Sequence, residues 1–237
     1  MIGTFVWLAL MIAHPIPAST PPPVAQLSPA SILQRYAAAL RRAKEPRVIS
    51  FDYTLEQTGL RTLSQTHRVF RSGTDERDET LTNDGKRPPL PIVRIFRGRR
   101  NRYSLGLLAP RVTDYAFAFV GLHKDGHHVD YSFHLTPKSA RPFAVTDVTI
   151  DGIRFLPLAI TFATEANEGV GTIAFGSNAR WWVPYIATAR ATVLDDPATE
   201  KLTFYTYRFP RTLPTSTFTQ ARRPASGTPR VPPAASL

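Results

Sequence analysis

The chain of 237 residues contains no cysteine. Without cysteine it cannot form a disulfide scaffold, a thiolate metal site, a cysteine nucleophile or the acylated anchor of a bacterial lipoprotein. It also lacks the Gly-x-Ser-x-Gly and His-Glu-x-x-His motifs of common hydrolases and a glycine-rich phosphate-binding loop. Because no residue pattern indicates catalysis, we predict a protein that is not an enzyme and needs no cofactor.

Acidic residues are scarce relative to basic ones, 18 against 29, which gives a formal net charge of +11. A surplus of this size favours contact with anionic surfaces, such as phosphate-bearing lipid headgroups. Arginines are densest over residues 94–102, where we expect Arg97, Arg99 and Arg100 to contact an anionic group. A solvated hairpin tip is the alternative interpretation. No nucleic-acid-binding motif surrounds this segment, so nucleic acid is not an expected partner.

Long apolar runs are absent, and the one short run covers residues 2–13. A membrane-spanning helix needs about 20 apolar residues, so this run is too short to span and fits the core of a signal peptide. We predict a signal peptide over 1–18, a proline-rich linker over 19–28 and a disordered, Pro/Arg-rich tail over 219–237. Residues 29–218 then form a single domain, and the protein is periplasmic or secreted. A buried or interfacial N-terminal helix is the alternative for the apolar run.

One amphipathic helix is predicted over residues 29–44. Ser28 is a suitable N-cap, and a proline follows it in the first turn, where its missing amide hydrogen costs nothing. Ile32, Tyr36 and Leu40 recur at four-residue spacing, which places them on one apolar face.

After this helix the hydrophobic period changes to two. Residues 49–55 alternate apolar and polar side chains, as do several later segments separated by turns such as Asp125-Gly126. Segments 92–96 and 102–108 are predicted to be short strands, and the charged segment 75–80 is interpreted as a solvated strand. Roughly ten strands after one helix predict an α+β domain with a large antiparallel meander.

One helix cannot cover the apolar face of a sheet of about ten strands. Such a sheet curls on itself, packs against another sheet or binds something on that face. Composition alone leaves open whether the aromatic-rich face lines a cavity or forms a filled core.

Histidines gather in the predicted hairpin GLHKDGHHVDYSFH. His128, Asp130 and His134 fall on one strand face, and imidazole and carboxylate groups bind zinc or copper. At ~3.3 Å per residue, however, His128 and His134 lie about 20 Å apart, so one ion cannot reach both. We therefore predict no metal site, and a metal-dependent activity at this hairpin stands only as a third hypothesis.

The order of these parts resembles the LolA/LolB-like superfamily of periplasmic outer-membrane lipoprotein carriers. The resemblance covers about residues 31–210, and its most suggestive pieces are the helix leading into VISFDYTLEQ and the strand WWVPYIA. It implies a strongly curved antiparallel meander sheet, an unclosed half-barrel, with the N-terminal amphipathic helix as a lid. The early arginine-proline segment typical of the soluble carriers is absent from VFRSGTDERDETL, so its role is not transferred.

The resemblance further implies a non-catalytic carrier whose partner is an acyl-chain amphiphile or a lipoprotein. We expect a monomer that makes transient contact with an anionic membrane surface or with a membrane donor or acceptor. The alternative is a periplasmic sensor or interaction module with a filled core, acting through its basic surface. The side chains expected to line an acyl-binding cavity are Phe51, Tyr53, Tyr115, Phe117, Phe119, Tyr131, Phe133, Ile160 and Phe162.

Overall fold

The computed structural model describes residues 27–219, apart from 60–61, 127, 142, 165–168 and 194–195. The predicted signal peptide, all but the end of the predicted linker and nearly all of the predicted tail lie outside the described residues. Among the helices that are described, none is long and apolar enough to cross a membrane.

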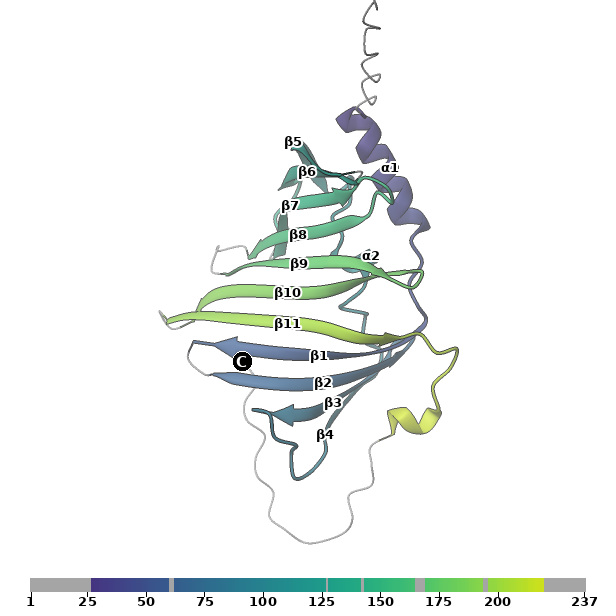
Figure 1. The fold of residues 1–237 in the computed structure, drawn as a ribbon, viewed down its shortest axis with the longest axis vertical. Helices are drawn as coiled ribbons and strands as arrows, with labels where there is room; N and C mark the ends of the chain where they lie inside the picture. The colour runs from purple at the N-terminus through teal and green to yellow at the C-terminus, as the bar shows by residue number, and fades with distance from the viewer. Residues whose placement is uncertain are drawn as a thin grey trace, which may run out of the picture.

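In the described part of the chain, eleven strands form a single antiparallel sheet, with the order β4-β3-β2-β1-β11-β10-β9-β8-β7-β6-β5 (Figure 1). The sheet is not closed into a barrel, because β4 and β5 are its two edges. The predicted α+β class with a large antiparallel sheet is confirmed, although the sheet consists of two meanders joined by the pairing of β1 with β11. The half-barrel curvature stays a prediction. The strands are β1 (Val48–Thr58), β2 (Leu63–Ser72), β3 (Asp75–Asn83), β4 (Ile92–Phe96), β5 (Tyr115–Asp125), β6 (His128–Pro137), β7 (Phe143–Asp151), β8 (Pro157–Thr164), β9 (Gly169–Asn178), β10 (Trp181–Val193) and β11 (Asp196–Arg208).

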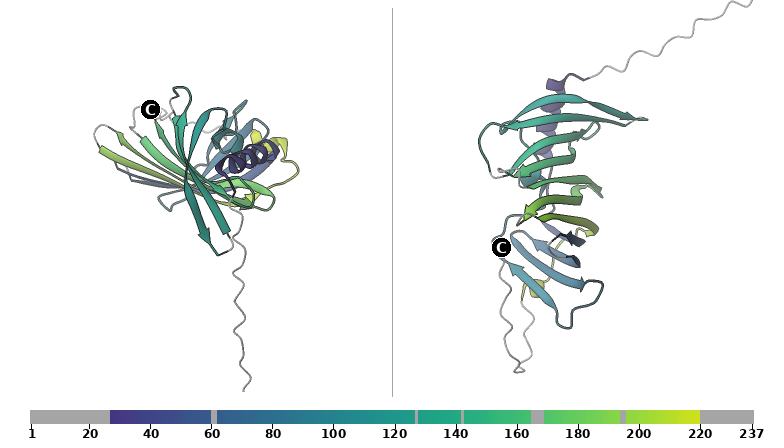
Figure 2. Two further views of the ribbon diagram at one scale, coloured as in Figure 1. Left: turned by 90° about the horizontal axis from the view of Figure 1, so that it is seen from above. Right: turned by 90° about the vertical axis from the view of Figure 1, so that its left-hand side faces the viewer.

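The helix α1 (Pro29–Arg42) begins where the sequence predicts and ends two residues earlier than predicted. The Ser28 hydroxyl accepts a hydrogen bond from the Ser31 amide at 3.3 Å, which caps the first turn. The helix ends because Ala43 is already extended, with ψ of 117°. Figure 2 shows α1 lying against one side of the sheet, toward the β5 edge.

We call the side of the sheet that α1 covers the helix face. Ile32 and Tyr36 are fully buried there and belong to the same core cluster as Phe133. Register pairing continues this face across the sheet in one apolar row, which runs through Phe133, Val148, Ile160, Ile173, Ala187, Leu202 and Leu55. The period-two alternation predicted along the chain therefore builds one continuous apolar surface.

Residues 102–108, which were predicted to form a strand, instead form a turn and the short helix α2 (Leu105–Leu108). The Ser104 hydroxyl caps α2 by accepting a hydrogen bond from the Leu107 amide at 3.2 Å. The segment 97–110 crosses from the β4 edge to α1 without entering the sheet. We call it the covering segment. The 3₁₀ helix η1 (Thr215–Phe218) lies beside β3, where Arg77 donates hydrogen bonds to its backbone.

Candidate functional site

A cavity of about 560 Å³ opens on the helix face, between the sheet and the covering segment. Its volume falls in the ~300–1,000 Å³ range of small-molecule sites. The lining comes from two sheet regions and from the covering segment, and consists of Tyr53, Leu55, Gln65, His67, Asp78, Arg94, Phe96, Arg99, Arg102, Tyr103, Leu108, Ile173, Pro184, Ala187, Glu200, Leu202 and Phe204.

The two ends of this cavity differ in chemistry. The end over β9–β11 is mainly aliphatic and aromatic, whereas the end over β2–β4 carries charged side chains. The alternation along β3 directs Glu76 and Asp78 to the helix face, where they are 0% and 6% exposed. The interpretation of residues 75–80 as a solvated strand is therefore wrong for these two carboxylates. Glu76 is enclosed by arginines of neighbouring segments, and Asp78 is enclosed mainly by side chains of β1 and β2.

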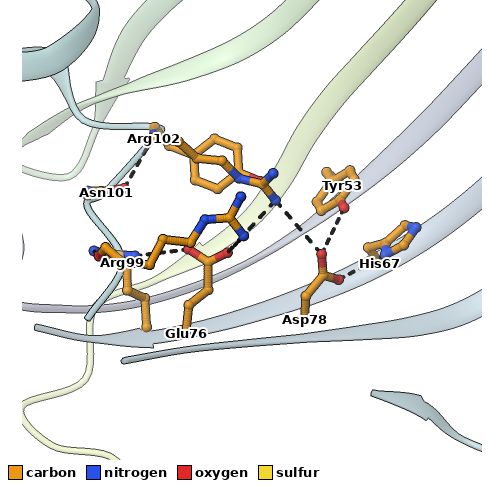
Figure 3. Close-up of polar contacts among 9 residues, drawn as sticks. Tyr53, His67, Glu76, Asp78, Arg99, Asn101 and Arg102 are labelled. Carbon is orange, nitrogen blue, oxygen red and sulfur yellow. Dashed lines mark hydrogen bonds and ion pairs between the residues drawn. The ribbon is translucent and has the colours of Figure 1, made fainter. Parts of the chain in front are cut away.

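Glu76 lies at the centre of an arginine cluster (Figure 3). Arg71 Nη1 donates to Glu76 Oε2 at 2.9 Å, and Arg71 Nη2 donates to the Arg99 carbonyl at 2.6 Å. Glu76 Oε1 lies 3.7 Å from Arg99 Nη1 and 3.8 Å from Arg102 Nη2, and it accepts no hydrogen bond from either. Three guanidinium groups thus surround one carboxylate, and Arg99 Nη1 keeps a buried donor without a hydrogen-bond partner among the described residues.

Asp78 joins this cluster to the cavity wall formed by β1 and β2. The Tyr53 hydroxyl donates to Asp78 Oδ2 at 3.1 Å, and His67 Nδ1 lies 2.8 Å from Asp78 Oδ1. The Tyr53 and His67 rings stack with centroids 4.6 Å apart (Figure 3). Burial disfavours the charged form of Arg102, but the negative charge around it, including Glu76 and Asp78, raises its pKa. Arg102 therefore remains a cation at the cavity wall.

Buried tyrosines give the site a testable pH dependence. Burial raises the pKa of the Tyr53 and Tyr103 hydroxyls far above the ordinary value of 10.0. The folded protein then keeps these protons at a pH where the unfolded chain loses them. Stability is complete below pH ~10 and falls as pH rises further, by about 1.4 kcal/mol per pH unit for each such tyrosine.

We expect urea unfolding midpoints to show this decline, and Tyr53→Phe to make it shallower. Absorbance titration of the folded protein at 295 nm should show these tyrosines ionising only as the protein unfolds. Ionisation of all eight tyrosines near pH ~10 in the folded state would contradict the burial argument.

A second cavity, of about 450 Å³, lies between the C-terminal half of α1 and the covering segment. A small pocket separates the two cavities. It shares Leu105 and Trp182 with the second cavity, and Tyr103 and Pro184 with the larger one. Hollows thus follow one another along the helix face beneath α1 and the covering segment.

The residues predicted to line the cavity are placed in two groups. Tyr53 lines the larger cavity and Phe51 lines the small pocket beside it. The others belong to, or flank, the core cluster under α1: Tyr115, Tyr131, Phe133 and Ile160 are buried, Phe117 and Phe162 are partly buried against them, and Phe119 is 41% exposed with its ring against Phe133. Their role in ligand binding stays a prediction.

Among the predicted arginines, only Arg99 lines the cavity. Arg97 pairs with Asp75 and donates to the Phe218 carbonyl, and Arg100 is exposed. Arg94 and Arg102 line the cavity as well, although neither was among the arginines expected to contact an anionic group. The alternation of residues 92–96 could have shown that Arg94 shares a face with Phe96, but only the cross-strand pairing of Arg94 with Asp78 identifies that face.

No protein-family model and no curated protein matches this sequence. Among solved structures, the chain is similar to a LolA superfamily protein from Nitrosomonas europaea, with 12% identity, a TM-score of 0.43 and coverage of 82% of this chain and 99% of that one. It is also similar to an outer membrane lipoprotein-sorting protein domain from Vibrio parahaemolyticus, with 12% identity, a TM-score of 0.45 and coverage of 79% and 96%. A third is a DUF1329 family protein from Desulfovibrio piger, with 9% identity, a TM-score of 0.46 and coverage of 80% and 97%.

The superfamily that the sequence resembles is therefore also found among the structural neighbours. All three TM-scores lie below 0.5, so these likenesses carry no argument about function. The case for function rests on the cavity.

Proposed function

We propose that this protein is an exported, non-catalytic carrier that binds the acyl chain of a lipid or lipoprotein in the periplasm. The observation that supports the proposal is the division of the 560 Å³ cavity into an apolar end and an arginine-bearing end. An amphiphile has the same division, with its chain at one end and its polar head at the other.

The apolar end suits an acyl chain. Ile173, Ala187, Leu202 and Phe204 lie there, and all four face the cavity from neighbouring strands. Each methylene removed from water contributes about 0.8 kcal/mol, so a chain of several methylenes binds without any polar contact.

The charged end suits an anionic head. Arg94, Arg99 and Arg102 line it, and Arg99 Nη1 is a buried donor that makes no hydrogen bond to any described residue. Hydrogen bonds between a guanidinium and a carboxylate or phosphate are short and strong compared with neutral ones. In this proposal the head replaces water around these arginines while Glu76 and Asp78 keep them in place.

We further propose that α1 and the covering segment together act as the lid. The Tyr36 hydroxyl donates to the Pro110 carbonyl at 2.9 Å and joins the helix to the end of this segment. The two therefore move as a unit, and outward movement would open the cavities beneath them.

A sensor or interaction module with a filled core is the second candidate. The observation in its favour is that most of the aromatic residues predicted to contact ligand instead pack against α1. Such a module would bind no amphiphile and would act through its basic surface.

Palmitate binding separates the carrier from the interaction module, and two matched variants on β10 test whether the ligand binds in the cavity. Native mass spectrometry and calorimetry with palmitate should show uptake of about one molecule per chain. Ala187→Trp fills the apolar end and should weaken binding at least about tenfold, since a bulky ring occupies the space of several methylenes. Ile186→Trp is the control, because Ile186 is 40% exposed and is the neighbouring residue on β10.

The head is tested by a second ligand with the same chain. Lysophosphatidylcholine, which has no net charge, should bind more weakly than palmitate, and Arg99→Gln should reduce this difference. A protein that purifies without lipid and takes up neither ligand would overturn the carrier proposal in favour of the interaction module.

A further inference from the structure

We propose that His128, Asp130 and Asp151 form a binding site for a divalent transition-metal ion, such as Zn²⁺ or Mn²⁺. The site goes beyond the carrier function, because it lies on the other side of the sheet from the cavity. Tyr131 and Ile150 point into the core under α1, so their neighbours Asp130 and Asp151 point to the opposite face.

The ligand atoms already lie close together. His128 Nε2 is 2.8 Å from Asp130 Oδ1 and 3.6 Å from Asp151 Oδ2, and the three donor atoms lie within 4.8 Å of one another. Nitrogen and oxygen ligands sit ~2.0–2.2 Å from zinc, so neighbouring ligand atoms are about 3 Å apart. Side-chain rotations that close the widest of these separations by roughly 1–1.5 Å would let the three atoms hold one ion.

The strand pairing builds this arrangement. Asp130 on β6 is paired directly with Asp151 at the end of β7, and the strand period puts His128 on the same face as Asp130. In the turn after β7, Asp151 Oδ1 accepts hydrogen bonds from the amides of Ile153 and Arg154. These bonds fix the carboxylate so that its other oxygen, Oδ2, is the one near His128.

Among the described residues, neither carboxylate has a lysine or arginine as counter-ion, although the Ile153 and Arg154 amides donate to Asp151 Oδ1. The Asp151 side chain is only 7% exposed, and Asp130 Oδ1 is buried and accepts no hydrogen bond from any described residue despite its short distance to His128 Nε2. Like charges directly opposite on neighbouring strands are destabilising, and a buried carboxylate needs a counter-charge. A bound cation supplies both needs.

A second histidine–aspartate pair on β6 and β7 serves as a comparison for the proposed metal site. His134 Nδ1 lies 2.9 Å from Asp147 Oδ1, but these side chains are 57% and 49% exposed and involve one carboxylate. That pair is an ordinary surface contact. The proposed site has two carboxylates, one of them deeply buried, around one imidazole.

The mixture of donors indicates the class of ion. Imidazole favours zinc, iron, nickel and copper, and carboxylates also suit manganese, whereas sites for calcium and magnesium consist of oxygen ligands alone. Three protein ligands leave further coordination positions, and the 41% exposure of His128 leaves them open to water.

A bound ion would also stiffen the support of α1. Asp151 begins the turn that contains Phe155, and the Phe155 ring stacks on Tyr131 with centroids 6.4 Å apart. The Arg35 guanidinium of α1 lies 5.2 Å from the centre of the same ring. A metal ion joining β6 to this turn would therefore hold the surface on which the helix rests.

The test is calorimetric titration of the EDTA-treated protein with Zn²⁺, with native mass spectrometry to count the ions. We expect one Zn²⁺ per chain, and a loss of affinity of at least about 100-fold in Asp130→Asn and in His128→Gln, since removing a ligand costs at least as much as removing its supporting contact. The control His134→Gln should bind Zn²⁺ as the unaltered protein does. Zn²⁺ should also raise the melting temperature of the unaltered protein and not that of Asp130→Asn.

Absence of stoichiometric Zn²⁺ and Mn²⁺ binding would overturn the proposal. So would an equal loss in His134→Gln, or binding that Asp130→Asn leaves unchanged. Circular dichroism of each variant shows whether the sheet is intact. Palmitate uptake is measured for the same variants. Because the metal site and the cavity lie on opposite sides of the sheet, loss of Zn²⁺ binding with unchanged palmitate uptake concerns the metal site alone, and loss of palmitate uptake with unchanged Zn²⁺ binding concerns the carrier proposal alone.

Discussion

Replacing Glu76 by alanine should destabilise the protein by about 3–5 kcal/mol, because the change leaves Arg71 buried without its counter-ion. Glu76 is fully buried, and the Arg71 side chain is only 5% exposed. Arg71 cannot turn to water, since its other amino group is held by the Arg99 carbonyl. Urea unfolding followed by tryptophan fluorescence measures the loss.

Two further variants show whether the cost comes from the unpaired charge. Glu56→Ala removes an exposed partner of Lys201 and should cost less than ~1 kcal/mol. The double variant Arg71→Met/Glu76→Leu should recover much of the stability lost in Glu76→Ala, because it removes both charges and keeps the volume filled. If Glu76→Ala costs no more than Glu56→Ala, the carboxylate does not hold the cluster together.

Tyr36→Ala should cost a similar amount, about 3–5 kcal/mol, because it deletes a fully buried ring from the centre of the helix–sheet interface. The ring lies 6.1 Å from that of Phe117, and the hydroxyl holds the covering segment through Pro110. We expect α1 to lose its protection from amide hydrogen exchange before the strands do, since Tyr36 is one of only two fully buried side chains by which the described helix joins the core.

Tyr36→Phe separates the ring from the hydroxyl. It keeps the packing and should cost only about 1 kcal/mol for the lost hydrogen bond, plus any cost of leaving the Pro110 carbonyl unpaired. Gln34→Ala, at an exposed position of the same helix, should have almost no effect. Equal costs for Tyr36→Ala and Gln34→Ala would mean that the helix contributes little to the fold.

Local patterns in the sequence were sufficient for most of the fold. The capping Ser28 and the four-residue spacing of Ile32 and Tyr36 located α1, and period-two alternation located the strands. The segment 102–108 was misassigned because its apolar residues suit a strand as well as a short helix. Ser104, an N-cap residue directly ahead of the segment Leu105–Leu108, was the signal for the helix.

The candidate site was harder to predict because its parts meet only through strand pairing. Alternation alone could place Glu76 and Asp78 on one face of β3, but not show that this face was the inner one. Their partners Arg99 and Arg102 lie in a segment that crosses over the sheet, and a local pattern contains no information on that crossing. Asp151 was missed in the same way, since it becomes a neighbour of His128 only when β7 pairs with β6.

The pairing of β1 with β11 makes the middle of the sheet the last part that can form during synthesis. One edge of β1 stays unpaired until the ribosome has synthesised β11, some 140 residues later. A chain cut short before residue 196 would leave two separate meanders, each with an open edge available to other chains. Pairing of the last strand with the first therefore removes two open edges at once, and it joins the two meanders into one sheet.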